Sequence, residues 1–315
     1  MALAILHSPS EWVARWGTSG KRTAITIGNF DGVHLGHQRI LRTVLERAEE
    51  KGLIAAALTF DPHPVRVLRP ARAPSPLTTM EQKLTLLNET GLDAVFVMRF
   101  DPNLARVSAE DFVRRYLVET IRAQVVLVGE NFRFGYKHAG DTRLLDELGK
   151  QLGFAVEVVP PVAVDGVVVS STLIRQMVRD GRVEEARRLL GRPFALAGEI
   201  AQGTGQGGKL VVPTLNLRTT QEAMLKTGVY VTETVVEGKM YRSATNVGMR
   251  PTFDGSHLTV ESHLFDFRQS VTSGPMEIRF WARLRDEMKF TGPGTLREQV
   301  RKDLEQARRF FREKP

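Results

Sequence analysis

The ten residues from Gly28 to His37 combine glycines, an aspartate and two histidines in a spacing that could bind phosphates. They read Gly-Asn-Phe-Asp-Gly-Val-His-Leu-Gly-His, after an apolar strand-like run and before a segment with apolar residues at helical spacing. A glycine-rich turn between a strand and a helix directs backbone N–H groups at anions, and the helix N-terminus favours negative charge. His34 and His37 lie on one face of the first helical turn, so both can donate to the same phosphate chain. The pattern therefore indicates chemistry on a nucleotide.

Other phosphate and metal motifs do not fit these residues. The turn lacks the Gly-Lys-Ser/Thr ending of a P-loop and the G-x-G-x-x-G spacing of a dinucleotide site. The H-x-G-H sequence also lacks the glutamate that flanks the histidines of a zinc-protease helix. Because the chain has no cysteine to act as a soft ligand, zinc is disfavoured.

Length and composition indicate an ordinary globular chain. Its 315 residues favour two domains. It has no run of about 18 apolar residues and no signal-peptide pattern at its start, so we expect neither a membrane span nor export. The absence of cysteine excludes disulfides and is compatible with the cytoplasm, where we expect the protein. The net charge of +8 is spread without a basic block, which favours small anionic substrates over nucleic acid.

Strand-like and helical patterns alternate in the first half of the chain. Helical patterns begin at Thr79, at Ser108 and near Asp141, and the first two residues head capping-box patterns. Such alternation predicts a Rossmann-like α/β domain whose parallel sheet binds ligands beyond the carboxyl ends of its strands. The strand-like runs cover residues 23–27, 53–60, 93–100, 124–128 and 155–159.

The pattern changes near residue 190. One helix is predicted from about Ser171 to Leu190, followed by short strands, a hairpin turn at Glu237-Gly238 and a helix over 295–312. These elements predict a small antiparallel β-barrel with a terminal helix. We expect the α/β domain to cover residues 1–188 and the barrel domain to cover residues 189–315. The predicted barrel strands are 195–201, 209–217, 229–236, 240–247, 258–267 and 276–284.

Four motifs in the first half resemble the FMN adenylyltransferase module of bacterial bifunctional FAD synthases, within the nucleotidyltransferase superfamily. They are residues 28–37, 60–64 (Phe-Asp-Pro-His-Pro), 128–135 (Val-Gly-Glu-Asn-Phe-Arg-Phe-Gly) and 169–175 (Val-Ser-Ser-Thr-Leu-Ile-Arg). The resemblance implies catalytic roles for His34, His37 and Arg175. It also implies flavin contacts from Asp61 and Asn131. The residues that it implies for ATP binding are Gly28, Phe30, Asp31, Gly36, Ser171 and Thr172.

The second half resembles the riboflavin kinase module of the same enzymes. A glycine-rich segment precedes Pro-Thr-Leu-Asn at 213–216, and further matching stretches lie at 245–253 and 260–267. Thr214 and Asn216 carry hard oxygen donors suited to Mg²⁺ on ATP phosphates. The resemblance implies that Glu261 is the general base and that Arg250 contacts the flavin. The ATP-binding glycines that it implies are Gly203, Gly205 and Gly207.

The sequence departs from the usual kinase pattern at two positions. Gly208 stands where the family commonly has arginine, and Val211 replaces a glycine. Lys209, next to the first of these, offers a replacement for the missing charge.

The expected function is a two-step synthesis of a flavin cofactor. Riboflavin and ATP give FMN and ADP at the barrel; FMN and ATP then give FAD and pyrophosphate at the α/β domain, both with Mg²⁺. Two alternatives stay open: a transferase for another phosphorylated vitamin, and a basic nucleic-acid-binding protein with vestigial sites. The fused P-T-x-N barrel argues against the first, and intact His37, Arg175 and Glu261 argue against the second. The oligomeric state is not predicted.

Overall fold

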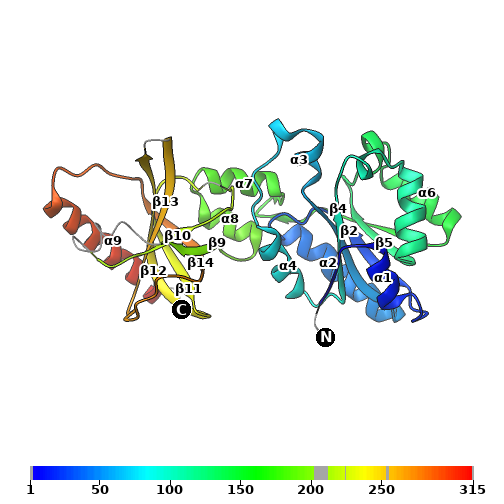
Figure 1. Cartoon of the computed structure of the whole chain (residues 1–315), viewed down its shortest axis with the longest axis horizontal. Helices are drawn as coiled ribbons and strands as arrows, with labels where there is room; N and C mark the ends of the chain where they lie inside the picture. Colours follow the sequence, from blue (N-terminus) through cyan, green and yellow to red (C-terminus); the bar gives the residue numbers. More distant parts are fainter. Residues whose placement is uncertain (1–2, 202–211, 224, 253–254, 314–315) are drawn as a thin grey trace. The chain divides into compact units, whose positions relative to one another are not determined.

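The structure is a computed structural model of the chain, coloured along the sequence in Figure 1. It describes residues 3–201, 212–223, 225–252 and 255–313, of which 250–252 and 255–257 are described by their backbone alone. The chain forms two compact units. The first comprises Met1–Pro74 and Met80–Ser170, and the second comprises Ser75–Thr79 and Ser171–Pro315. The sequence places the boundary between the two functional domains between residues 188 and 189, and this boundary stays a prediction.

The first unit is built on a six-stranded parallel sheet with the strand order β1-β4-β3-β2-β5-β6. The predicted parallel sheet is confirmed. Its strands contain runs of Val, Ile and Ala, which favour a sheet that is buried on both faces. The short strand β1 was not predicted. The strands are β1 (Ala4–Leu6), β2 (Thr23–Ile27), β3 (Ile54–Asp61), β4 (Ala94–Arg99), β5 (Ala123–Gly129) and β6 (Ala155–Val159).

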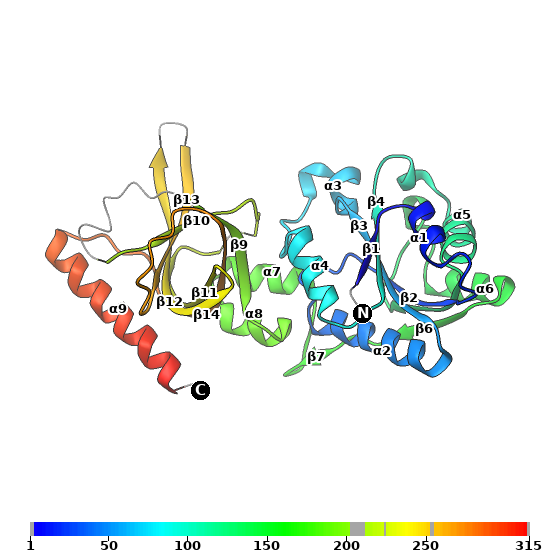
Figure 2. The same ribbon diagram turned by 60° about the horizontal axis from the view of Figure 1, so that its bottom comes forward.

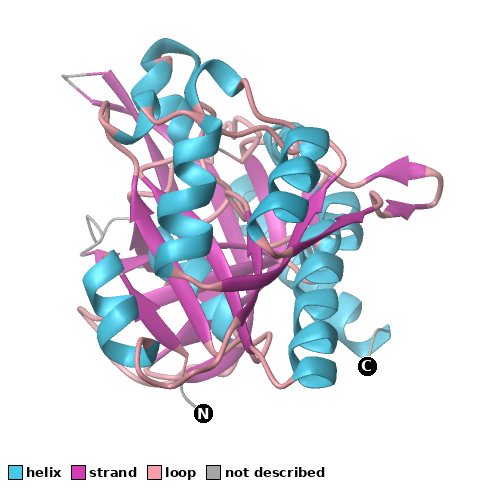
Figure 3. Ribbon diagram, turned by 90° about the vertical axis from the view of Figure 1, so that its right-hand side faces the viewer, coloured by secondary structure: helices cyan, strands magenta, loops and turns pink. Residues whose placement is uncertain are grey.

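Helices cover both faces of this sheet (Figure 3). Ala24 of β2 packs into a core with α2 and α4, whereas its neighbour Ile25 packs into a core with α1, α5 and α6. The predicted starts at Ser108 and Asp141 are confirmed, since each side chain accepts a hydrogen bond from a backbone N–H three residues on. The helices are α1 (Pro9–Trp16), α2 (Leu35–Lys51), α3 (Pro64–Leu68), α4 (Met80–Asn88), α5 (Ala109–Phe112) and α6 (Thr142–Leu152), with a π-helical segment at Val113–Thr120 and a hairpin of β7 (Ala163–Val164) and β8 (Val167–Val168).

The second unit begins with two helices, α7 (Ser171–Arg179) and α8 (Val183–Leu190). The prediction of one continuous helix is therefore wrong. Gly181 adopts a left-handed conformation with φ of 78°, which ends α7, and the N–H of Arg182 bonds back to the carbonyl of Met177 at 2.8 Å. The segments on both sides of the break have apolar residues at helical spacing, because both helices bury an apolar face.

Six antiparallel strands of the second unit close into a barrel, and α9 runs along its outside (Figure 2). The predicted turn at Glu237-Gly238 is confirmed, with φ of 51° and 73° at its two residues and Val236 paired to Lys239. The strand predicted over 209–217 is observed only from Leu215; residues 212–214 form a loop, and 209–211 lie outside the described residues. The elements are β9 (Phe194–Ala201), β10 (Leu215–Arg218), β11 (Gly228–Val236), β12 (Lys239–Thr252), β13 (Gly255–Leu264), β14 (Pro275–Arg285) and α9 (Pro293–Glu313).

The barrel interior contains a closed ring of five hydroxyl side chains, all fully buried. Successive oxygens in the ring lie 2.7 to 3.0 Å apart. Each hydroxyl has two partners in the ring, so these polar groups are satisfied without water, and such chains of hydrogen bonds strengthen one another. In ring order the residues are Thr232, Ser243, Thr234, Ser262 and Thr245.

Replacing Thr232 with valine is expected to lower the free energy of unfolding by about 1–3 kcal/mol. The shape of the side chain is nearly kept, but Ser243 and Thr245 each lose a buried hydrogen-bond partner. Denaturation by urea, followed by circular dichroism, measures the change. The exposed helical Thr85→Val variant is the control, and an equal effect in both variants would contradict the importance of the ring.

Among the residues that the structure describes, no helix is long and apolar enough to cross a membrane.

Candidate functional site

The histidine turn places two imidazole rings in direct contact at the start of α2. Nδ1 of His34 accepts a hydrogen bond from the backbone N–H of His37 at 3.3 Å, which makes His34 the N-cap of the helix. Because Nδ1 is an acceptor, the ring proton of His34 lies on Nε2, where it can be donated. The two rings stack with centroids 3.6 Å apart, and the Phe30 ring meets His37 edge-on at 5.2 Å. The turn therefore holds both imidazoles in fixed orientations.

The glycines of the motif make room for these rings. A Cβ atom on Gly36 would lie 3.1 Å from Cε1 of His34, and one on Gly28 would lie 3.1 Å from Cζ of Phe30. Phe30 and Val33 both have positive φ, 47° and 37°, which is an uncommon conformation for bulky side chains. Backbone strain of this kind concentrates at functional sites.

A buried lysine that the sequence did not single out lies near the same turn. Lys83 of α4 is only 7% exposed, and Asp31 is 4% exposed. Burial lowers the pKa of Lys83, and the nearby carboxylates of Asp31 and Asp61 oppose that shift. One sequence signal could have found it: Lys83 lies four residues before Leu87, on the apolar face of its helix.

The carboxyl ends of three neighbouring strands bring further motif residues to one edge of the sheet. Asp61 is the last residue of β3, and Asn131 follows the end of β5 by two residues and is exposed. The turn after β2 is tied to β3, because the N–H of Gly28 donates to the carbonyl of Leu58 at 3.0 Å. The expected position at this edge is confirmed; the flavin-binding roles stay predictions.

Ser171, Thr172 and Arg175 lie in the second unit, where Ser171 is the first residue of α7. Arg175 is buried, and its Nε donates to the carbonyl of Ser75 at 2.7 Å. The predicted helix start is confirmed, and the cooperation of these residues with the histidines of the first unit stays a prediction.

In the barrel, the register of three adjacent strands aligns three polar residues. Asn216 of β10 pairs with Glu261 of β13, and Glu261 pairs in turn with Asn246 of β12. Directly paired residues share a face of a sheet. Their neighbours Ser262 and Thr245 belong to the buried ring on the opposite face. Glu261 and Asn216, predicted from separate motifs, are thus brought side by side.

His263 fixes the loop that carries the predicted metal ligand Thr214. Its Nδ1 donates to the carbonyl of Pro213 at 2.8 Å, which ties the P-T-x-N segment to β13. Sequence alternation places His263 on the face of Glu261, but only the structure shows its partner.

A cavity of about 270 Å³ brings Thr214 and Glu261 to one site in the second unit. Its lining contains both polar and apolar side chains. The polar lining residues are Thr214, Thr245, Asn246, Glu261, Arg285, Glu287 and Asp303; the apolar ones are Val212, Val229, Ala244, Met288, Phe290, Leu296, Val300 and Leu304.

An ion pair in the lining of this cavity joins β14 to α9. Arg285 donates to both carboxylate oxygens of Asp303, the shortest N···O distance being 2.6 Å, and Gln299 donates to the same carboxylate at 2.9 Å. The side chain of Asp303 is 5% exposed and that of Arg285 is 19% exposed. The pair therefore fixes the helix that forms one wall of the cavity.

Replacing Asp303 with alanine is expected to lower the free energy of unfolding by about 3 kcal/mol, because it leaves a largely buried guanidinium without its counter-charge. Glu298→Gln is the matched control on α9, since Glu298 forms an exposed pair with Lys302 and should matter by less than about 0.5 kcal/mol. Thermal and urea unfolding of both variants measure the difference. Equal free energies of unfolding for the two variants would show that the Arg285–Asp303 pair does not hold α9 in place.

Several predicted residues cannot be placed. Gly203, Gly205 and Gly207 lie outside the described residues, as do Gly208, Lys209 and Val211. Arg250 lies on β12, with its side chain outside the described part. In the part that the structure describes, no three His, Asp or Glu side chains gather in a way that could hold a metal ion.

Comparison with known proteins matches both halves of the chain. A family model described as FAD synthetase matches residues 18–173, and one described as riboflavin kinase matches residues 190–311. A relative from Pseudomonas fluorescens is 37% identical over 286 residues, which are 90% of this chain and 91% of the relative. One from Escherichia coli K12 is 34% identical over 288 residues, 91% and 92% of the two chains. Both are named bifunctional riboflavin kinase/FMN adenylyltransferase.

A solved structure shares the fold over nearly the whole length. It covers 98% of this chain and 99% of its own, with a TM-score of 0.87 and 27% identity, and is titled as a macrolide-efflux protein from Streptococcus pneumoniae. The histidine turn on a parallel sheet and the glutamate in a barrel cavity define a two-site transferase. The chain belongs to the family of bifunctional riboflavin kinase/FMN adenylyltransferases.

Proposed function

We propose that the chain performs both reactions named for its family. The barrel phosphorylates riboflavin with ATP, giving FMN and ADP, and the α/β unit joins FMN to the adenylyl group of ATP, giving FAD and pyrophosphate. The observation that carries this proposal is that one chain holds both a stacked histidine pair at a strand–helix turn of the first unit and, in the second unit, a cavity lined by Glu261, which pairs with Asn216. Riboflavin, FMN, FAD and ATP are then its substrates and products.

At the barrel, Glu261 acts as the general base. Its carboxylate takes the proton of the ribityl 5′-hydroxyl while that oxygen attacks the γ-phosphorus of ATP and ADP leaves. The apolar residues of the lining suit the flavin ring, and the polar residues suit the reacting groups. Gly203, Gly205, Gly207 and Arg250 are proposed to contact ATP and flavin by the resemblance alone.

At the α/β unit, a phosphate oxygen of FMN attacks the α-phosphorus of ATP and pyrophosphate leaves. No proton need be removed from the nucleophile, so the residues work by positioning and by stabilising negative charge. His34 and His37 donate to the ATP phosphates, with the backbone of the turn around Asp31 and Gly36. Ser171, Thr172 and Arg175 form a second phosphate clamp. Asp61 and Asn131 are proposed on the flavin side.

Magnesium fits the donors of the barrel site. The hydroxyl of Thr214 and the amide oxygen of Asn216 are hard ligands beside a carboxylate. When bound, Mg²⁺ neutralises charge on the ATP phosphates; the protein residues hold and orient those phosphates. We also propose, from the lack of cysteine, that the protein works in the cytoplasm.

The direct experiment incubates the full chain with riboflavin, ATP and Mg²⁺ and separates the flavins over time. FMN should appear first and FAD second, with ADP and pyrophosphate released in matching amounts, and a chelator should stop both steps. An unchanged riboflavin pool would refute the proposal. A second incubation supplies FMN in place of riboflavin. If FAD forms there while riboflavin is not phosphorylated, the result supports only the adenylyltransferase reaction.

A further inference from the structure

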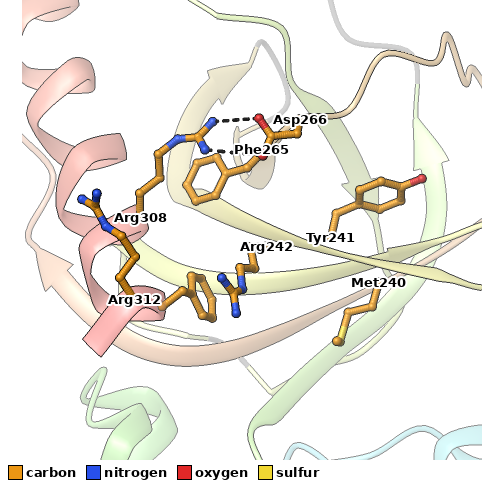
Figure 4. Close-up of a pocket in the computed structure, with 8 residues that line it drawn as sticks. Met240, Tyr241, Arg242, Phe265, Asp266, Arg308 and Arg312 are labelled. Atoms are coloured by element: carbon orange, nitrogen blue, oxygen red, sulfur yellow. Dashed lines mark hydrogen bonds and ion pairs between the residues drawn. The ribbon is translucent and has the colours of Figure 1, made fainter. Parts of the chain in front are cut away.

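The second unit has another cavity, of about 450 Å³, that shares no lining residue with the one around Glu261. Figure 4 shows that it lies between the start of β12, the end of β13 and the last turns of α9. Helix α9 lines both cavities: Asp303 and Leu304 line the cavity around Glu261, and Arg308 and Arg312 line the larger one.

Three guanidinium groups gather around this cavity: Arg242, Arg308 and Arg312. The one carboxylate in its lining, Asp266, neutralises little of their charge. It is 83% exposed and accepts from Arg308 at 3.4 and 3.5 Å, which is long for such a pair. Within the described chain, neither Arg242 nor Arg312 has a carboxylate within ion-pair distance, and the neighbouring Glu313 pairs with Arg309 at 2.6 Å.

Two of these guanidinium groups are supported by aromatic rings. Arg308 lies 4.3 Å above the ring of Phe265, and Arg242 lies 5.2 Å from the ring centre of Phe311. Both phenylalanines are buried, at 5% and 6% exposure, so the rings are fixed supports. A ring contacts only the face of a guanidinium, so the N–H donors at its edge can bind a planar or tetrahedral oxyanion in bidentate fashion. In Arg308 these donors make the long contacts to Asp266, which a bound oxyanion would replace.

We infer that this cavity binds a phosphate-bearing small anion, at a site that shares no lining residue with the cavity around Glu261. Arg recognises phosphate oxygens with paired N–H donors, and the lining of this cavity supplies three guanidinium groups against one exposed carboxylate. The volume lies in the range of small-molecule sites and is larger than a single phosphate requires, so a diphosphate or a phosphate ester fits best. This inference does not depend on the proposed reactions.

The test is titration calorimetry of the full chain with inorganic pyrophosphate, at low ionic strength and without Mg²⁺. Wild type is compared with Arg242→Ala/Arg312→Ala and with the matched control Arg309→Ala, whose side chain lies on the same helix outside the cavity. We expect the double variant to lose one equivalent of binding, or to bind that equivalent at least about tenfold more weakly. Arg309→Ala should bind like wild type, and pyrophosphate sites elsewhere should be unchanged in all three.

A parallel titration with adenosine monophosphate separates the possible ligands. Tighter binding of pyrophosphate than of adenosine monophosphate indicates a diphosphate site. Tighter binding of adenosine monophosphate indicates a phosphate-ester site that also contacts the nucleoside. The single exposed substitution Arg312→Gln serves if the double variant does not fold. Identical isotherms for wild type and the arginine variants, with both anions, would overturn the inference.

Discussion

Replacement of Glu261 by glutamine is expected to slow riboflavin phosphorylation by about 10²- to 10⁴-fold, the range typical for loss of a general base. Glutamine keeps the shape of the side chain and its place beside Asn216 and Asn246, but it cannot take the proton of the attacking hydroxyl. Conversion of supplied FMN to FAD should proceed at the wild-type rate, because that reaction has no proton to remove and does not use Glu261.

Initial rates of FMN and FAD formation, measured separately, check this prediction. Glu199→Gln is the matched control, since Glu199 is an exposed strand glutamate of the same barrel that does not line the cavity. Wild-type phosphorylation by Glu261→Gln would remove Glu261 from the role of base. A large rise in the KM for riboflavin at unchanged kcat would instead make it a binding residue.

Replacement of His37 by alanine is expected to arrest the pathway at FMN. The imidazole lies between the rings of His34 and Phe30, and its loss removes a fixed hydrogen-bond donor at the point where charge builds on the phosphates. Loss of one such donor typically costs about 10²- to 10³-fold in rate. The backbone N–H of residue 37 still reaches Nδ1 of His34, so the start of α2 should persist.

The rate of FAD formation from supplied FMN and ATP measures this effect. His7→Ala is the control, because His7 is exposed and lies outside every motif. Undiminished FAD formation by His37→Ala would show that the histidine pair serves only to cap the helix. Phosphorylation of riboflavin should be the same in both variants.

Much of the fold could be predicted from local patterns. The ends of β2, β3 and β5 follow from buried apolar runs that stop at Gly28, Asp61-Pro62 and Gly129, where the ligand-binding edge of a parallel sheet must lie. The break at Gly181 was missed because the segments on both sides of it carry apolar residues at helical spacing. The three-residue strand β1 is too short to show any period.

The candidate sites were predicted in part, because motifs name residue types but not their partners. The pairing of Asn216 with Glu261 depends on strand register, and the Arg285–Asp303 pair joins a strand to the terminal helix. Lys83 lies on the apolar face of a helix outside the four motifs of the first half, and its place near Asp31 follows only from how α4 packs on the sheet. Such long-range contacts have no signature in a single sequence.

The most direct test of two separate sites mixes two variants, each of which should lack one of the two reactions. His37→Ala alone should accumulate FMN from riboflavin and ATP, and Glu261→Gln alone should leave riboflavin unchanged. Because FMN made by the first variant is the substrate of the second, the mixture should produce FAD. Failure of the folded mixture to produce FAD, or loss of both activities in either variant, would contradict two separate sites in one chain.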